Sequence, residues 1–336
     1  MVQVFLTGAT GYIGGSILAR FTDQWPSFNY RALTRSTDKA SKLNQFKNIE
    51  AVVGDNNSFD LIEDEAKKAD VVIHTANSAD DMPSTKAIVS GIEKGKGKSA
   101  IYIHVSGTGA LVDDARGLHD QHTTYDDSDS QHINTLPTSQ VHRDVDEFLL
   151  EHSDKMQLHI VYPSTVWGQA VDHALYKAGI SNCFSVQMPS LAAIFVELKQ
   201  AKVVGDGKNI WPNVHIYERL VVDLFQLILR NAIEGKISSD KSGSYFFGVT
   251  DHYYYSEAVG VMANALSKHG RISSANVESF SSADFDRFDA LWYFGSNCRG
   301  RATRARSLGW KPQRGTKDFY ADLPKLVQDL IQSGKV

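Results

Sequence analysis

The chain of 336 residues has little cysteine, no large excess of charge of either sign and no long apolar run. Its two cysteines, Cys183 and Cys298, are far apart and lack the spacing of a metal site, so we expect no metal. A formal net charge of -4 gives no general affinity for nucleic acid or for an anionic membrane. No apolar segment has the length that crosses a bilayer. A strand-like run from Val2 leaves no room for a signal peptide, which makes the cytoplasm the expected location.

The first half of the chain alternates strand-like and helix-like segments. The predicted strands are Val2–Leu6, Tyr30–Thr34, Glu50–Val53, Asp70–Ala76, Ala100–Ser106 and Gln157–Tyr162. The predicted helices between them are Ile13–Phe21, Lys39–Phe46, Asp60–Lys68 and Thr85–Lys94. Two strands are nearly continuous runs of apolar and β-branched residues, which is typical of strands buried on both faces. This order predicts an α/β fold built on a doubly wound parallel sheet of the Rossmann kind.

The second half lacks this regular alternation of strand-like and helix-like segments and is richer in aromatic residues. We predict a dinucleotide-binding domain over residues 1–163 and a smaller C-terminal substrate lobe over 164–336, with segments that partly return to the sheet. Residues 108–137 are polar and predict a long irregular loop, either functional or a disordered surface excursion. Further helices are predicted over Ser139–His152, Pro189–Ala201 and Glu218–Ile233.

A glycine-spaced turn follows the first predicted strand directly, as Thr7-Gly8-Ala9-Thr10-Gly11-Tyr12-Ile13-Gly14. In such a turn the first glycine allows the chain to leave the strand, the second lets a pyrophosphate approach the backbone, and the third lets helix and strand pack closely. The free N–H groups of the helix start would then face the phosphates. The strand before it and the apolar helix after it indicate a dinucleotide site rather than a glycine-rich turn without a ligand.

The end of the second strand indicates which dinucleotide is bound. An NAD site places an acidic residue there, but this strand is followed by Arg35, with Lys39 one helical turn later. A guanidinium suits a 2′-phosphate, so we predict NADP(H). The alternative is that both cations are solvated surface residues. Asp55 and Asn56 follow the third strand, near an adenine, and Thr75 and Ala76 end the fourth.

These features resemble the extended and atypical short-chain dehydrogenases/reductases, a group that includes sugar-nucleotide epimerases and NmrA-like proteins. The matching segments are the glycine turn, Gly54-Asp55, Val105-Ser106, Tyr162-Pro163-Ser164-Thr165-Val166-Trp167-Gly168, Gly205-Asp206-Gly207, Val214-His215 and Leu308-Gly309-Trp310-Lys311-Pro312. The resemblance implies hydride-transfer or epimerase chemistry carried by a Tyr-x-x-x-Lys pair. It also implies a serine or threonine at the end of the fifth strand that holds the substrate carbonyl.

The chain keeps that serine as Ser106 but not the pair. Matching the helix places Arg143 at the lysine position and Ser139 at the tyrosine position, four residues apart on one predicted helix face. Arg143 could hold a ribose or pair with Glu147, but it cannot exchange its proton near neutral pH. The usual mechanism is therefore in doubt.

Three residues are candidates for the proton transfer in place of the pair: His142, Tyr162 and Tyr125. A histidine is the best suited at neutral pH. Each also has a structural interpretation, as a helix-surface, packing or loop residue. The proposed catalytic residues are Ser106, His142, Arg143 and Tyr162. The proposed cofactor contacts are Thr7, Gly8, Thr10, Gly11, Tyr12, Ile13, Gly14, Arg35, Lys39, Asp55, Asn56, Thr75, Ala76, Ser106, Arg143, Tyr162, Pro163 and Val166.

Three functions remain open from the sequence. The first is an NADP(H)-dependent oxidoreductase of atypical short-chain type, acting on a small carbonyl or conjugated substrate. The second is a sensor or regulator of NmrA type that binds NADP without turnover and has a protein partner. The third is an isomerase or epimerase that uses the cofactor transiently. The sequence decides neither the substrate nor whether two copies form a homodimer.

Overall fold

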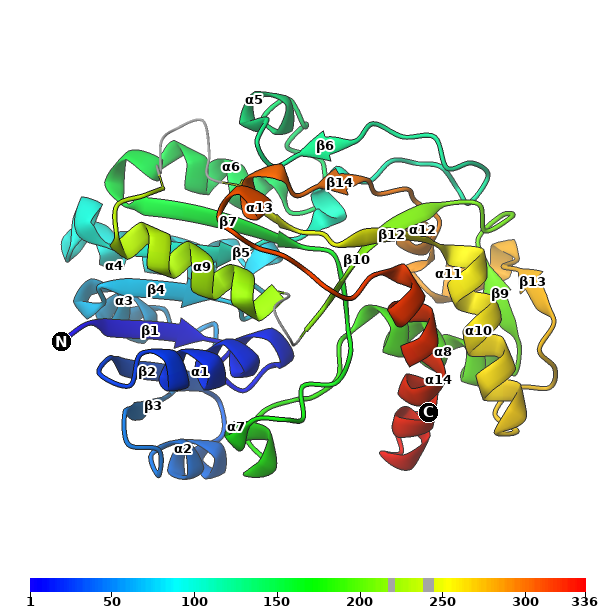
Figure 1. The fold of residues 1–336 in the computed structure, drawn as a ribbon, viewed down its shortest axis with the longest axis horizontal. Coiled ribbons are helices and arrows are strands. Elements are labelled where there is room, and N and C mark those ends of the chain that lie inside the picture. The colour runs from blue at the N-terminus through cyan, green and yellow to red at the C-terminus, as the bar shows by residue number, and fades with distance from the viewer. Residues whose placement is uncertain (217–220, 238–244) are drawn as a thin grey trace.

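A parallel β-sheet forms the centre of the protein, as the computed structural model shows for residues 1–216, 221–237 and 245–336 (Figure 1). In the described residues its order is β3-β2-β1-β4-β5-β7-β11, with every pairing parallel. The strands are β1 (Gln3–Thr7), β2 (Asn29–Thr34), β3 (Ile49–Val53), β4 (Val71–His74), β5 (Ile101–Val105), β7 (Gln157–Pro163) and β11 (Tyr245–Gly248). This sheet confirms the predicted α/β fold class.

Helices cover both faces of the sheet, so its central strands β4 and β5 are buried on both sides. On one face α1 (Tyr12–Gln24) packs against α9 (Val221–Ile233). On the other, α4 (Met82–Lys94) packs between α3 (Phe59–Lys68) and α6 (Arg143–Glu151). All residues of β4 and β5 are buried, which explains their apolar, β-branched sequences. The short α2 (Thr37–Leu43) connects β2 to β3.

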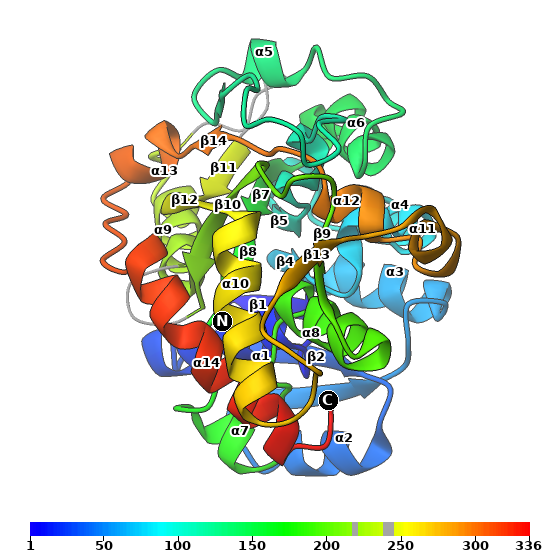
Figure 2. The same ribbon diagram turned by 90° about the vertical axis from the view of Figure 1, so that its right-hand side faces the viewer.

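The C-terminal half builds a second layer at the carboxyl edge of the sheet (Figure 2). A three-stranded sheet joins β8 (Thr165–Trp167), β10 (Ile210–His215) and β12 (Asp251–Tyr254), and a two-stranded sheet joins β9 (Ala201–Val203) and β13 (Val277–Ser279). The surrounding helices are α7 (Ala174–Lys177), α8 (Gln187–Leu198), α10 (Tyr255–Lys268), α11 (Ser282–Arg287), α12 (Leu291–Phe294) and α14 (Thr316–Gln332). None of the helices in the described ranges is long and apolar enough to cross a membrane.

Two helix boundaries differ from the prediction because a residue has a left-handed backbone. The helix predicted over Ser139–His152 starts only at Arg143, because His142 has a left-handed φ of +69° that a helix cannot pass through. Ser139 therefore lies in the turn before α6, and the predicted Ser139–Arg143 helix face does not exist. The helix predicted to reach Ala201 ends at Leu198, because Lys199 is left-handed with a φ of +57°. Of the predicted Glu218–Ile233 helix, residues 218–220 lie outside the described residues.

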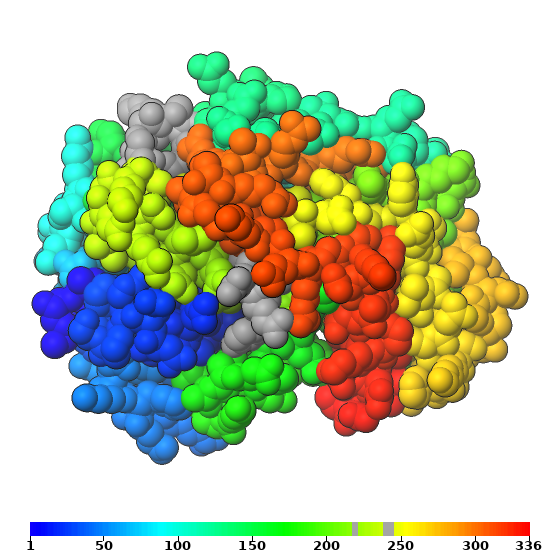
Figure 3. All heavy atoms as spheres, in the orientation of Figure 1, coloured from blue at the N-terminus to red at the C-terminus, as the bar shows by residue number. Residues whose placement is uncertain are grey.

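The long segment 108–137 is ordered and attached to the C-terminal half. It contains the 3₁₀ turn η3 (Thr108–Leu111), the strand β6 (Tyr125–Asp126) and the short helix α5 (Ser130–Ile133). β6 pairs in parallel with β14 (Gly300–Arg301), which precedes α13 (Thr303–Ser307). In Figure 3 the two segments lie against each other along the top of the molecule. The alternative of a disordered excursion is therefore wrong.

Candidate functional site

The glycine turn between β1 and α1 is shaped by close backbone contacts. Gly8 has a φ of +69°, and a Cβ there would lie 2.4 Å from Oγ1 of Thr75. A Cβ on Gly14 would lie 2.3 Å from the carbonyl oxygen of Gly8 and 2.4 Å from the same Oγ1. Only glycine fits at these two positions, so β1, α1 and the end of β4 approach one another as a dinucleotide turn requires.

The N-terminus of α1 has no side-chain cap. Its N-cap residue is Gly11, which has no side chain to accept a hydrogen bond, and the first turn contains no acidic residue. The first N–H groups of a helix have no partner within the helix, and the helix dipole places partial positive charge there. This end of α1 can therefore bind an anion such as a pyrophosphate.

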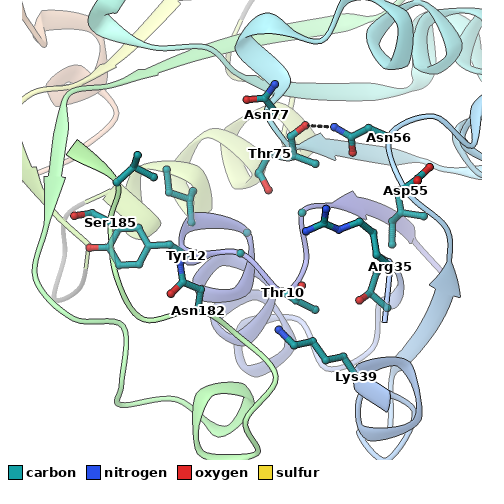
Figure 4. A pocket seen from close by; sticks show the side chains of 18 of the residues that line it. Thr10, Tyr12, Arg35, Lys39, Asp55, Asn56, Thr75, Asn77, Asn182 and Ser185 are labelled. Carbon is teal, nitrogen blue, oxygen red and sulfur yellow. Dashed lines mark hydrogen bonds between the residues drawn. The ribbon is translucent and has the colours of Figure 1, made fainter. Parts of the chain in front are cut away.

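A cavity of about 840 Å³ opens in front of this helix end (Figure 4). Of the predicted cofactor contacts, the structure places the following on its wall: Gly8, Thr10, Gly11, Tyr12, Ile13, Gly14, Arg35, Lys39, Asp55, Asn56, Thr75, Ala76 and Val166. They come from the carboxyl ends of β1 to β4 and from β8. Open α/β sheets bind their ligands at this edge.

Arg35 and Lys39 form the cationic side of the cavity. In Figure 4 both side chains lie on one side of Thr10, opposite Tyr12 and Asn182. Neither makes a side-chain hydrogen bond or ion pair within residues 1–216, 221–237 and 245–336. The nearby α2 is capped by the Ser36 hydroxyl, which accepts from the Lys39 backbone N–H at 3.2 Å. Two unpaired cations at the end of β2 favour a ligand with negative charge there.

Asp55 and Asn56 line the cavity with different roles. The Asn56 side-chain amide donates to the carbonyl oxygen of Ala76 at 2.6 Å and to Oδ2 of Asp81 at 2.7 Å, which ties the ends of β3 and β4 together. Oδ1 of Asp55 accepts from the Asn57 backbone at 2.9 Å, whereas its Oδ2 has no partner among the described residues. Asp55 can thus accept a hydrogen bond from a ligand, while Asn56 shapes the wall.

The opposite wall comes from the C-terminal half and was not predicted, apart from Val166. It consists of Ser164, Asn182, Ser185, Val186 and Gln187. The Asn182 backbone N–H donates to the carbonyl oxygen of Thr10 at 3.0 Å, which brings this segment onto the glycine turn. Residues 182–187 have no motif, so no signal in the sequence could have found them, whereas Ser164 lies within the matching segment Tyr162–Gly168. Leu33, Thr34, Gly54, Asn57 and Asn77 also line the cavity without having been predicted.

Five of the predicted residues belong instead to the packed interior, outside the cavity wall: Thr7, Ser106, Arg143, Tyr162 and Pro163. Oγ1 of Thr7 lies 2.7 Å from Nδ1 of His74 and accepts from the Thr75 backbone at 3.2 Å. Thr7 therefore joins β1 to β4 rather than lining the cavity.

Ser106 and Tyr162 share one acceptor. The Ser106 hydroxyl donates to Oδ2 of Asp146 at 3.1 Å, and the Tyr162 hydroxyl donates to the same oxygen. Burial raises the pKa of Asp146 to about 6, against the opposing effect of these hydrogen bonds and of Arg143. A Ser106 proton directed at Asp146 cannot at the same time be donated to a substrate carbonyl.

Arg143 is 1% exposed and lies in the same polar cluster. Its Nη1 donates to the Tyr245 hydroxyl at 3.1 Å, and its Nη2 lies 3.5 Å from Oε1 of Glu147. The second contact is the i,i+4 pair that the sequence left open beside a ribose contact. In this structure Arg143 stabilises the interior at the start of α6.

His142 and Tyr125 lie outside the cavity wall as well. His142 precedes α6, and its Nδ1 lies 2.6 Å from Oδ1 of Asp80, in the 3₁₀ turn η1 (Ser78–Asp80) after β4. The carbonyl oxygen of Asn77, which lines the cavity, accepts from the Asp80 backbone N–H at 3.1 Å. The His142–Asp80 pair therefore lies one turn away from the cavity wall. Tyr125 lies in β6, where its ring is 4.6 Å from that of His132.

The cavity fits a nicotinamide dinucleotide. Gly8 and Gly14 provide the close backbone approach, α1 presents its uncapped N–H groups, and cations stand at the end of β2. From Arg35 the wall extends past the glycine turn to Ser164 and Gln187, which is the direction that an extended dinucleotide would follow.

Comparisons with known proteins agree with this geometry. Residues 8–157 match a family model described as NAD(P)H-binding. The chain is 25% identical over 332 residues to a protein named oxidase ucsJ from Acremonium sp, with 92% of each chain covered.

Solved structures show the same fold at low sequence identity. A PbgP3 protein from Burkholderia pseudomallei superimposes with a TM-score of 0.66 at 12% identity, covering 99% of this chain and 98% of that one. UDP-glucose 4-epimerase from Bifidobacterium longum, in complex with NAD⁺ and UDP, gives 0.61 at 16% identity, with 99% of each chain covered. The DesIV dTDP-glucose 4,6-dehydratase from Streptomyces venezuelae, solved with NAD, gives 0.63 at 13% identity over 97% and 96%. The chain thus has the Rossmann fold of these epimerase and dehydratase structures, and its residues 8–157 are similar to an NAD(P)H-binding family, which agrees with the predicted resemblance.

Proposed function

We propose that the protein is an NADP(H)-dependent oxidoreductase that acts on a small carbonyl or conjugated substrate. The observation that carries the cofactor preference is the pair of unpaired cations, Arg35 and Lys39, on the cavity wall beside the end of β2. No acidic side chain stands in the Arg35–Lys39 stretch except Asp38, which pairs with Lys42 at 3.0 Å. A ribose 2′-phosphate would be held by these cations, whereas a 2′-hydroxyl would find no carboxylate there.

Redox chemistry is supported by the site and by a relative. A bound nicotinamide would supply or accept the hydride. Its end of the cavity would be bounded by Ser164, Val166 and Gln187, which the C-terminal half brings to the sheet edge. The relative from Acremonium sp is named an oxidase, which agrees with this class of reaction.

The affinity test uses two substitutions on the same short segment. Arg35→Asp should weaken NADPH binding at least tenfold and change NADH binding less than threefold, because charge-assisted hydrogen bonds to a phosphate contribute roughly 1.5–3 kcal/mol. Lys47→Gln is the matched control, since Lys47 is exposed shortly after α2 and lies outside the cavity wall. Dissociation constants can be measured from nucleotide fluorescence. Equal losses for both nucleotides would remove Arg35 from the 2′-phosphate site.

The reaction test follows NADPH absorbance with a panel of aldehydes, ketones and enones. Consumption of NADPH with matching substrate reduction supports the proposal. Turnover without net change in NADPH would instead indicate an isomerase or epimerase.

A sensor of NmrA type is the second candidate, and the interior position of Arg143 favours it. The residue at the family's lysine position contacts Tyr245 and Glu147 and does not line the cavity. A sensor predicts tight binding without turnover, different affinities for NADP⁺ and NADPH, and a protein partner. Equal affinities combined with turnover on the panel would exclude it.

A further inference from the structure

Two polar atoms near the carboxyl end of β5 have no hydrogen-bond partner in the described parts of the chain. They are Nε2 of His142 and the hydroxyl oxygen of Tyr293 in α12. A Cβ built on Gly109 would lie 2.9 Å from this Nε2 and 2.7 Å from this hydroxyl, so both atoms converge on Gly109. Partly buried polar groups that face each other without a partner are suited to bind a polar ligand atom.

The position of His142 is held by contacts and by an unusual backbone conformation. Its Nδ1 lies 2.6 Å from Oδ1 of Asp80, and its side chain is only 14% exposed. Its φ of +69° lies in the left-handed region, which is uncommon for residues other than glycine. Such strain persists where the surrounding structure fixes it, and it clusters at functional sites.

The pair lies beside the cofactor cavity. Asp80 ends the 3₁₀ turn that Asn77 begins, and Asn77 lines the cavity next to Thr75 and Ala76. Gly107 and Gly109 follow β5, the neighbour of β4 in the sheet. Tyr293 comes from the C-terminal half, where its ring packs 4.7 Å from that of Trp211. Two strand ends and the C-terminal layer therefore meet at this point.

We propose that His142 transfers the proton and Tyr293 binds the oxygen of the substrate, with Asp80 positioning the imidazole ring. Proton transfer by His142 presupposes the oxidoreductase function proposed above. Carbonyl reduction would add a hydride to carbon, which a bound nicotinamide would supply, and a proton to oxygen, which we assign to Nε2 of His142. The imidazolium becomes a neutral imidazole whose Nδ1–H stays hydrogen-bonded to Asp80. Solvent then restores the proton on Nε2, since the side chain is partly exposed.

Several ionisable groups face His142 from the elements packed around it. Asp80 is on η1, Asp146 on α6, His104 on β5 and Tyr293 on α12. Burial lowers the pKa of His104 well below its usual value and raises that of Tyr293 well above it, so both stay neutral near pH 7.

The activity test uses His142→Asn and His142→Gly. Both residue types accept a positive φ, so neither change strains the turn. His142→Asn should lower kcat about a hundredfold or more, as expected for a lost general acid, and leave the NADPH dissociation constant within twofold. Added imidazole should restore part of the activity of His142→Gly. His269→Asn is the control, because His269 is exposed at the end of α10 and should leave activity unchanged.

The positioning roles have separate readouts. Tyr293→Phe should raise the KM for the carbonyl substrate about fivefold with a smaller change in kcat, because a single neutral hydrogen bond is lost. Asp80→Ala should lower kcat and shift the proton of neutral His142 from Nδ1 to Nε2. Nitrogen-15 NMR of the imidazole in the cofactor-free protein measures this tautomer independently of activity.

Separate results would contradict the role of His142, the oxidoreductase function and the role of Asp80. If wild-type protein reduces a substrate and His142→Asn keeps kcat within threefold, then His142 is not the proton donor, while the oxidoreductase function stands. If wild-type protein binds NADPH but turns over nothing on the panel, the oxidoreductase function fails, and the role of His142 fails with it. A tautomer unaffected by Asp80→Ala would remove Asp80 from its positioning role.

Discussion

The guanidinium of Arg143 donates a hydrogen bond to the Tyr245 hydroxyl across 3.1 Å, and this contact links the start of α6 to the edge strand β11. The Tyr245 hydroxyl in turn donates to Oδ1 of Asn134 at 2.8 Å, in the long segment before α6. A residue that the family resemblance assigned to the cofactor thus links α6 to β11, 102 positions later in the sequence, and through Tyr245 to the segment before α6.

The first prediction is that Arg143 acts on stability rather than on nucleotide affinity. Arg143→Met should lower the free energy of unfolding by about 3–5 kcal/mol, because removing one partner leaves a buried polar cluster uncompensated. The NADPH dissociation constant should stay within twofold. Urea unfolding and nucleotide fluorescence measure the two effects. Arg301→Met serves as the control, since its side chain is 70% exposed. A tenfold loss of NADPH affinity in folded Arg143→Met would support the ribose contact instead.

The second prediction concerns Asp127, which fastens the long segment to the C-terminal half. Its Oδ2 accepts from the backbones of Phe247 and Ala305 at 3.0 Å each, and its Oδ1 accepts from that of Arg304 at 2.6 Å. In Asp127→Asn the NH₂ group must face at least one of these donors. The free energy of unfolding should therefore fall by about 2 kcal/mol, measured by urea unfolding. The exposed Asp289→Asn should change it by less than about 0.5 kcal/mol, and an equal effect of both changes would contradict the fastening role.

The third prediction concerns His159, in the middle of β7. It is fully buried, and neither ring nitrogen has a hydrogen-bond partner in the described part of the chain. Burial lowers its pKa to about 3, from 6.5 in the unfolded chain. Between these values the unfolded state binds more protons, so stability falls as the pH drops from about 6.5 toward 3. One such group accounts for about 2 kcal/mol between pH 7.5 and pH 5.

His159→Leu should therefore raise stability at pH 5 and flatten its pH dependence, because it removes an unpaired polar ring of similar size. Urea midpoints at pH 5, 6 and 7.5 measure this effect. His269→Asn is again the exposed control. An unchanged pH slope in His159→Leu would mean that another group carries the acid sensitivity.

The fourth prediction contrasts two glycines in helices. Gly14→Ala places a Cβ 2.3 Å from the Gly8 carbonyl oxygen, so we expect a loss of about 2 kcal/mol or more in stability and at least a tenfold loss of NADPH affinity. Gly260→Ala in α10 meets nothing within 4 Å and should be neutral or stabilising by up to about 1 kcal/mol. Thermal unfolding and nucleotide titration separate the two. Wild-type affinity in Gly14→Ala would disprove the close approach at the turn.

The sequence by itself determined six strands of the central sheet, all except β11, and about half of the cavity wall. Val71–His74 and Ile101–Val105 are nearly continuous apolar runs because both faces of a parallel sheet are covered, and this makes such strands recognisable locally. The glycine turn is equally local, since the positive φ of Gly8 and the contact of Gly14 are requirements of the backbone. Arg35 lies on the cavity wall because it follows β2 directly.

Only the tertiary structure decided the rest of the site. Asn182 and Gln187 reach the cavity from a segment without a motif, because contacts between distant segments have no local pattern. Asp80, His142 and Tyr293 meet through the folding of three separate elements. The left-handed φ of His142 overrode the helical pattern of residues 139–152, and burial turned Arg143 into an interior residue. Local periodicity indicates which residues of a helix or strand face the core. Which residues of other elements they contact depends on how the elements pack against one another.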